Sequence, residues 1–171
     1  MNSWRDNVRK VEPYTPGEQP KEEGVIKLNT NENPYPPSEK IKEAMSEIKN
    51  LRKYPDPAAT KLVEAIASYH GFDKEEVFVG VGSDDVLAVA FMTFFNSDKP
   101  VLFPDITYSF YPVWADLYGV KYENPALDEN FRIRKEDYFK ENGGIIFPNP
   151  NAPTGLLEEL DTCLLYTSPS P

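Results

Sequence analysis

The sequence predicts an α/β fold in which helices flank a mostly parallel sheet, preceded by an extended amino-terminal arm. From residue 77 onward, short apolar strand candidates alternate with helical segments, which is typical of layered α/β proteins. Segment 83–95 is apolar nearly all round, as expected of a helix that is buried on several sides. Residues 1–24 are polar and contain Pro13, Pro16 and Pro20, which favour an extended chain.

The segment after the arm is predicted to contain one short strand and two helices. Residues 25–28 are a strand candidate, and 29–37 form a turn-rich loop of asparagines and prolines. A first helix is predicted over 38–50, with Ser38 as its cap. A second is predicted over 58–69 and is ended by Gly71. Each helix is predicted to turn an apolar face inward, formed in the first by Ile41, Met45 and Ile48 and in the second by Leu62, Ile66 and Tyr69.

The rest of the chain is predicted to alternate between strands and helices. The strands are 77–81, 100–103, 120–122 and 144–147, and the helices are 83–95, 108–118 and 135–141. In open α/β sheets, ligands bind beyond the carboxyl ends of the strands. The segments that follow the strands are therefore the places to look for chemistry.

Composition and charge narrow the class of protein. A chain of 171 residues suits one compact domain, and 40% hydrophobic with 27% charged residues is average for a globular protein. The longest apolar stretch, 86–95, is too short to span a bilayer. Eighteen basic against 28 acidic residues give a net charge of −10, which argues against a nucleic-acid partner because no basic stripe offsets it.

The two ends of the chain carry further information. The amino terminus has no apolar segment behind a basic start, so we expect no export and a cytoplasmic location. Cys163 is the only cysteine, so neither a disulfide framework nor a cysteine-based metal site is predicted. Residues 163–171 resemble the translation of a sequencing adaptor and are predicted to be a non-native tail, with an ordinary frayed terminus as the alternative.

A glycine turn leads from a predicted strand into the helix 83–95, with the sequence Gly80-Val81-Gly82-Ser83-Asp84-Asp85. Glycine lets the backbone approach a ligand, and the free amides of a first helical turn attract anions, so this turn is a candidate phosphate cradle. The alternative is a plain turn in which Ser83 caps the helix and the aspartates complement its dipole. The turn lacks the third glycine of a dinucleotide fingerprint and the lysine of a P-loop.

Two more segments follow predicted strands. Segment 105–111 contains aromatic rings that could stack on a flat cofactor, although such rings more often belong to the core. Segment 149–155 contains two prolines that fix a loop presenting amide side chains. Each signal alone is weak.

Five motifs in order carry a family resemblance: Leu28-Asn29-Thr30-Asn31-Glu32-Asn33-Pro34-Tyr35, Arg52-Lys53-Tyr54-Pro55-Asp56, Gly82-Ser83-Asp84-Asp85, Thr107-Tyr108, and Pro150-Asn151-Ala152-Pro153-Thr154-Gly155. Together they resemble the histidinol-phosphate aminotransferases, among the class I/II transaminases of fold type I. The resemblance covers residues 5–162. It divides the chain into an arm with a substrate-side loop (1–37), part of a large cofactor-binding domain (38–162) and the non-native tail (163–171).

The resemblance implies that the cofactor is pyridoxal 5'-phosphate. The cofactor would bind at the glycine turn that contains Gly82, with its phosphate on the backbone amides of Ser83 and Asp84 and its ring stacked on Tyr108. Tyr54 would reach the phosphate bound by a partner subunit, which implies a homodimer with shared sites. The substrate side would be lined by Tyr14, Asn31, Glu32 and Asn33.

Asn151 departs from the family pattern by one position. The family often has asparagine directly before Pro-Thr-Gly, where it binds the phenolic oxygen of the cofactor, but this sequence has Ala152 there. Asn151 is the candidate for that contact if the loop is rearranged. His70, the lone histidine, precedes a helix-ending glycine and is predicted to be a capping or surface residue rather than a catalyst.

The resemblance implies an enzyme that moves the amino group of histidinol phosphate to 2-oxoglutarate in histidine biosynthesis. Such an enzyme needs a lysine that binds the cofactor, an acidic partner for the pyridine nitrogen and a substrate-binding arginine. In the family these follow the Pro-Thr-Gly loop at a greater distance than this chain extends, so the chain alone is expected to hold no catalytic residue and to be inactive. The alternatives are a threonine-phosphate decarboxylase-like enzyme and a non-catalytic α/β module that binds a small anion.

Overall fold

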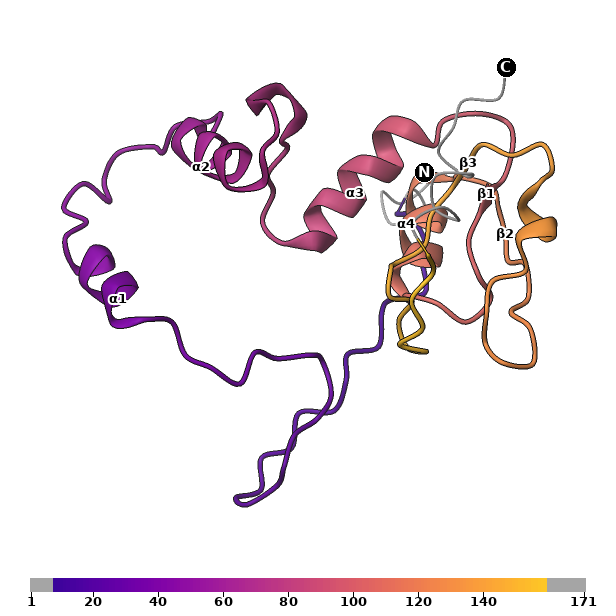
Figure 1. The fold of residues 1–171 in the computed structure, drawn as a ribbon, viewed down its shortest axis with the longest axis horizontal. Helices are drawn as coiled ribbons and strands as arrows, with labels where there is room; N and C mark the ends of the chain where they lie inside the picture. Colours follow the sequence, from indigo (N-terminus) through magenta and orange to yellow (C-terminus); the bar gives the residue numbers. More distant parts are fainter. Residues whose placement is uncertain (1–7, 160–171) are drawn as a thin grey trace, which may run out of the picture. The chain divides into compact units, whose positions relative to one another are not determined.

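The computed structural model describes residues 8–159, so the predicted non-native tail lies outside the described residues. The described chain forms two compact units. Residues 15–79 make the helical unit, and residues 8–14 together with 80–159 make the sheet unit. Figure 1 traces both units and labels their α-helices and strands.

Three short parallel strands lie at the centre of the sheet unit. β1 (Val101–Leu102) lies between β2 (Tyr122–Glu123) and β3 (Gly144–Ile145). Val101 pairs with Tyr122 on one side and with Gly144 on the other, and both pairings are parallel. The predicted parallel sheet is therefore confirmed.

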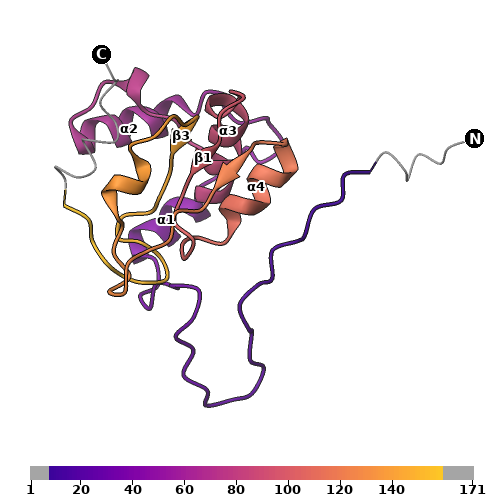
Figure 2. The ribbon, with the colours of Figure 1, turned by 90° about the vertical axis from the view of Figure 1, so that its right-hand side faces the viewer.

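Two helices pack on one face of this sheet. α3 (Ser83–Phe94) precedes β1, and α4 (Phe110–Tyr118) connects β1 to β2. Figure 2 shows α3 and α4 alongside β1. α4 ends where Gly119 adopts a φ of 71°, a left-handed conformation that glycine adopts readily. Both helices confirm the sequence prediction to within two residues at each end.

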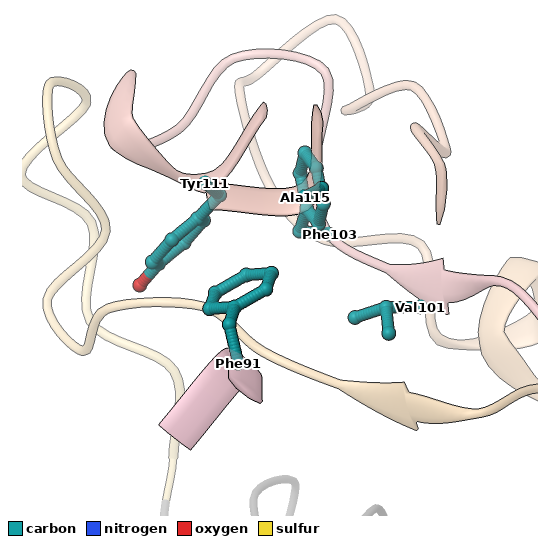
Figure 3. Close-up of a cluster of buried hydrophobic side chains, with 5 residues drawn as sticks. All are labelled: Phe91, Val101, Phe103, Tyr111 and Ala115. Carbon is teal, nitrogen blue, oxygen red and sulfur yellow. The ribbon is translucent and has the colours of Figure 1, made fainter. Parts of the chain in front are cut away.

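Each face of β1 has its own core, because successive strand residues point to opposite faces. On the Val101 face, the strand packs against α3 and α4. The buried cluster on this face consists of Phe91, Val101, Phe103, Tyr111 and Ala115 (Figure 3). The Leu102 face packs against Ile133 and Tyr138. Burying each large apolar side chain contributes roughly 1.5–3 kcal/mol, so these clusters hold the sheet unit together.

The helix predicted over 135–141 is a shorter 3-10 turn, η3 (Lys135–Tyr138). It ends early because the chain soon joins the sheet: the Gly143 N–H donates to the Pro100 carbonyl at 2.8 Å. The prediction for α3 was also partly wrong. Phe91 is fully buried, but Phe94 is 74% exposed, since α4 and the sheet cover only one side of the helix.

The helical unit contains α1 (Glu39–Ser46), α2 (Thr60–His70) and the short 3-10 turn η2 (Lys74–Glu76). Gly71 ends α2 in a left-handed conformation and donates its N–H to Ala67, as the sequence predicts. The predicted inward faces are wrong for this chain. α1 has no buried residue and α2 buries Ala67 alone, so the described residues of this unit leave the predicted apolar faces of both helices largely exposed.

The strands predicted at 25–28 and 77–81 do not form among the described residues. Val77 has the extended backbone of a strand, with φ −112° and ψ 120°. A strand also requires a neighbour that completes its hydrogen bonds, and the sheet pairs β1, β2 and β3 alone. No helix within residues 8–159 is long and apolar enough to cross a membrane.

Candidate functional site

The glycine turn at the start of α3 contains two glycines, Gly80 and Gly82. Close packing requires glycine at the first position, and the backbone conformation requires it at the second. A Cβ on Gly80 would lie 2.7 Å from Asp85 Oδ2 and 2.9 Å from Val86 Cγ2, so the turn is closely packed there. Gly82 is the residue before the helix, with φ 87° and ψ 173°, a region that only glycine adopts readily. A Cβ on Gly82 would meet no atom within 4 Å, so this side of the turn is open.

The start of α3 is not capped by a side chain. The alternative in which Ser83 caps the helix therefore does not describe this turn, because Ser83 is the first helical residue and Gly82 occupies the cap position. Asp85 instead accepts the Val81 N–H at 2.9 Å and closes the turn. The first amides of a helix have no partner within the helix, so those of Ser83 and Asp84 can receive an anion.

Asp84 contacts the second predicted site segment. The Tyr108 hydroxyl donates to Asp84 Oδ1 at 2.6 Å and joins the start of α3 to the turn before α4. Burial, and then the hydrogen bond to the Asp84 carboxylate, raise the pKa of Tyr108 above its ordinary value. The structure thus brings together two motifs that are 24 residues apart, a contact that the sequence pattern did not reveal.

Tyr108 belongs to an aromatic group that includes a residue of the arm. Its ring lies 5.8 Å from the Phe110 ring and 5.7 Å, edge to face, from the Tyr111 ring. Tyr14 stacks on the other end of this group, with its ring 4.3 Å from that of Phe110. The predicted substrate-side residue Tyr14 and the predicted stacking residue Tyr108 therefore lie in one aromatic group.

A pocket of about 300 Å³ lies beside Tyr108, beyond the carboxyl end of β1. Its volume is at the lower end of small-molecule sites, and its position is the one expected for ligand binding in an open parallel sheet. The lining comes from the segments after β1 and β2, and consists of Phe103, Pro104, Asp105, Thr107, Tyr108, Ser109, Pro112 and Asn124.

Asn151 is 3% exposed and connects the loop after β3 to the segment before Tyr108. Its Nδ2 donates to the Ile106 carbonyl at 3.0 Å and to Thr154 Oγ1 at 3.3 Å. Its Oδ1 accepts the Thr107 hydroxyl at 2.9 Å. The sequence does not predict this contact, although Thr107 belongs to the Thr107-Tyr108 motif.

The loop that contains Asn151 is closed by a pair of hydrogen bonds between Asn149 and Glu158. Asn149 Nδ2 donates to the Glu158 carbonyl at 3.0 Å, and the Glu158 N–H donates to Asn149 Oδ1 at 2.9 Å. Inside this pair, the Asn151 N–H donates to the Leu156 carbonyl at 2.8 Å. The two asparagines of the motif thus hold a compact loop at the edge of the sheet.

The remaining predicted site residues belong to the helical unit. Tyr54 is 101% exposed. Asn31 has a φ of 50°, and Asn33 Oδ1 accepts the Tyr35 N–H at 3.0 Å, so the loop is held by local turns. Glu32 pairs with Lys27 at 2.5 Å, and the hydrogen bond and charge of this lysine lower the pKa of the carboxyl.

His70 is exposed at the end of α2, as the sequence predicts for a capping or surface residue. Its ring lies 4.9 Å from the Tyr69 ring and 6.2 Å from the Phe72 ring. Within residues 8–159, no group of three or more histidine, cysteine, aspartate or glutamate residues is arranged to hold a metal ion.

Residues 23–163 match the family model of class I and II aminotransferases. Curated relatives named histidinol-phosphate aminotransferase are similar over most of the chain. The protein from Pseudomonas aeruginosa is 55% identical over 98% of this chain and 48% of its own length. The protein from Clostridium beijerinckii is 56% identical over 89% of this chain and 43% of its own length.

A relative from Pseudomonas putida, also named histidinol-phosphate aminotransferase, is 58% identical over 92% of this chain and 46% of its own length. The chain thus spans about half the length of the curated relatives that it matches. A solved aminotransferase structure from Erwinia carotovora atroseptica matches with a TM-score of 0.71 over 81% of this chain and 42% of its own, at 21% identity, and shows the fold. On these grounds the chain belongs to the class I and II aminotransferases, with the partial α/β fold of a fold-type I domain.

Proposed function

We propose that the full-length protein containing this chain is a pyridoxal-phosphate-dependent histidinol-phosphate aminotransferase of histidine biosynthesis, with 2-oxoglutarate as amino acceptor. The observation that carries this proposal is the 55–58% identity to relatives of that name over 92–98% of this chain. A homodimeric assembly and a cytoplasmic location belong to the same proposal.

The start of α3 fits the phosphate of this cofactor. Its first amides have no side-chain cap, Gly82 leaves open space, and Asp85 directs its carboxylate to Val81 instead of across the turn. Ser83 and Asp84 would hold the phosphate through their N–H groups, and Tyr108 would offer its ring to the cofactor ring. When bound, pyridoxal phosphate supplies the aldehyde that accepts the amino group and a ring that withdraws electrons from the reacting carbon.

Asn151 fits the predicted cofactor contact less directly. Both of its side-chain N–H groups are already donated, to Ile106 and to Thr154. A hydrogen bond from Asn151 to the phenolic oxygen of the cofactor therefore requires one of these two bonds to be exchanged. The longer bond, to Thr154 at 3.3 Å, is the one we expect to open.

The substrate side would be formed by Tyr14 with the loop of Asn31, Glu32 and Asn33. Tyr14 lies in the same aromatic group as Tyr108, which supports a place next to the cofactor. Tyr54 would serve the site of a second subunit, and its full exposure leaves the side chain available for such a contact.

The test is an assay of the full-length protein with pyridoxal phosphate. We expect amino transfer from histidinol phosphate to 2-oxoglutarate, followed as glutamate formed, to exceed transfer from histidinol or from amino acids. Release of CO₂ from threonine phosphate without amino transfer would instead support the decarboxylase. Phosphate binding without either reaction would support a non-catalytic anion-binding module.

We further propose that residues 1–171 alone are inactive. No described lysine lines the pocket beside Tyr108, and three of those in the sheet unit are engaged elsewhere, Lys99 with Glu141, Lys140 with Glu123 and Lys121 with Asp98. The test is to mix the chain with pyridoxal phosphate, reduce with borohydride and map the labelled peptides. We expect sparse labelling spread over several lysines, whereas one stoichiometric labelled lysine together with turnover would contradict the proposal.

A further inference from the structure

The hydrogen bond between Tyr108 and Asp84 is short and charge-assisted. At 2.6 Å, the distance from the Tyr108 hydroxyl to Asp84 Oδ1 falls in the range of O–H···O⁻ bonds, which are about twice as strong as neutral ones. The bond connects two segments that the proposed function assigns to different parts of the cofactor: the start of α3 to its phosphate and Tyr108 to its ring. A single side-chain contact therefore links the two halves of the proposed site.

The two aspartates of the turn do different things. Asp85 accepts the Val81 N–H and closes the glycine turn. Asp84 instead accepts a hydrogen bond from the Tyr108 hydroxyl, in the segment before α4. Complementing the helix dipole would require no such partner, since any carboxylate in the first turn supplies that effect. The direction of the Asp84 side chain therefore calls for a separate explanation.

The segment that carries Tyr108 is already fixed on its other side. Asn151 holds the carbonyl of Ile106 and the hydroxyl of Thr107, the two residues that precede Tyr108. With the backbone held there, the main freedom left to Tyr108 is rotation of its side chain. The bond to Asp84 removes that freedom by fixing the far end of the ring.

We propose that Asp84 is a positioning residue whose carboxylate fixes the orientation of the Tyr108 ring before the cofactor arrives. This inference rests on the proposed function, because it assigns the ring its cofactor. Prior orientation means that the ring loses little rotational freedom when it stacks, so binding is tighter than for a freely rotating tyrosine. Asp84 thus acts twice, through its amide on the phosphate and through its carboxylate on the ring.

Three variants of the full-length protein test the carboxylate without removing the amide. Asp84→Ala breaks the bond, Asp84→Asn keeps an oxygen that accepts the Tyr108 hydroxyl, and Tyr108→Phe keeps the ring but removes the donor. We expect Asp84→Ala and Tyr108→Phe each to weaken pyridoxal-phosphate binding about fivefold, the size of one net hydrogen bond. Asp84→Asn should stay within about twofold of the wild type because the bond is retained in neutral form.

The double variant Asp84→Ala/Tyr108→Phe tests whether Asp84 acts through its hydrogen bond to Tyr108 or only through its negative charge. It should bind pyridoxal phosphate no more weakly than either single variant, because both changes remove the same bond. The circular dichroism of the bound cofactor, which reports its fixed asymmetric environment, should fall in Asp84→Ala and recover in Asp84→Asn. Tyr111→Phe is the matched control, because Tyr111 lies in the same aromatic group and no bond joins it to Asp84; it should leave the dichroism unchanged.

A measurement without cofactor distinguishes this inference from the proposed function. In the apoprotein, urea unfolding of the wild type, Asp84→Ala, Tyr108→Phe and the double variant should show that the effects of the two single changes are not additive. If the wild type fails to bind pyridoxal phosphate while this coupling is present, the proposed function is wrong and the Asp84–Tyr108 bond still stands. Additive effects in unfolding and in binding, or no recovery with Asp84→Asn, would overturn the positioning role.

Discussion

At the residue scale, Gly82 allows a backbone conformation that the proposed phosphate cradle requires. Its φ of 87° and ψ of 173° lie in a region that costs other residues on the order of 1–3 kcal/mol. We predict that Gly82→Val in the full-length protein weakens pyridoxal-phosphate binding at least about tenfold, because the turn must rearrange and move its amides. Absorbance titration of the apoprotein with cofactor measures this effect.

Gly71 provides the control for that prediction. It also has a positive φ, 76°, and open space where a Cβ would project, but it ends α2 in the helical unit. Gly71→Val should cost stability of the order of 1 kcal/mol and leave cofactor affinity unchanged. Equal cofactor affinity in Gly82→Val and the wild type would contradict the cradle.

Asn151 stabilises the edge of the sheet through three side-chain hydrogen bonds. Because it is buried, removing the amide leaves the Ile106 carbonyl and the Thr107 hydroxyl without their partner. We predict that Asn151→Ala lowers the free energy of unfolding by about 2 kcal/mol, measured by urea denaturation. Asn124→Ala should cost less than about 1 kcal/mol, because its side chain makes one long bond, 3.3 Å to the Phe103 carbonyl. A reversed order would show that the Asn151 loop is not what holds this edge.

At the element scale, α3 has one face on the sheet and one face in the open. Phe91 is fully buried against Val101, Tyr111 and their neighbours (Figure 3), whereas Phe94, three residues later, is 74% exposed. We predict that Phe91→Ala destabilises residues 1–171 by about 3–5 kcal/mol, which loosens the helix that presents the glycine turn.

Phe94→Ala is the matched change on the same helix. It removes the same side chain from a position that makes few contacts, so the loss should be under about 0.5 kcal/mol. Thermal and urea unfolding of both variants measure the difference. Similar losses would mean that the exposed face of α3 is covered in solution.

At the scale of the whole molecule, the described residues 8–159 expose many large apolar side chains. In the helical unit they include the faces of α1 and α2, with Ile41, Met45, Ile48, Leu62 and Tyr69 all at least half exposed. Uncovered apolar surface of this kind promotes association. We predict that the chain alone self-associates at micromolar concentration and binds an apolar dye, measured by sedimentation and fluorescence. Replacing Ile41 and Met45 with glutamate should reduce both, and a monodisperse wild-type chain would contradict the prediction.

The shared-site arrangement is a second prediction at this scale. In the full-length protein, a Tyr54→Phe chain mixed with a chain lacking the cofactor lysine should form hybrid dimers in which one site has both its lysine and its Tyr54. We expect activity to recover toward one quarter of the wild type, since about half of randomly mixed dimers are hybrids with one complete site. Tyr69→Phe, another exposed tyrosine of the helical unit, should retain activity by itself. Activity that never recovers on mixing would rule out the shared site.

The sequence by itself determined the local features of this protein. The order of β1, α4 and β2, the end of α2 at Gly71 and the glycine turn before α3 follow from apolar periodicity and from glycine's conformational freedom. The family also followed from sequence, because five ordered motifs carry more information than any one of them. These features depend on residues that are close together in the chain.

Only the tertiary structure decided which distant groups meet. Pairing is a property of two segments, so the extended backbone at Val77 did not become a strand, whereas Val101 gained partners on both sides. The bonds from Tyr108 to Asp84 and from Thr107 to Asn151 span 24 and 44 residues, and nothing in the local pattern at either end specifies its partner. Burial was also decided by the tertiary structure. The apolar residues of α1 and α3 are visible in the sequence. In the structure, one side of α3 packs against the sheet, whereas none of the residues of α1 is buried by the described part of the chain.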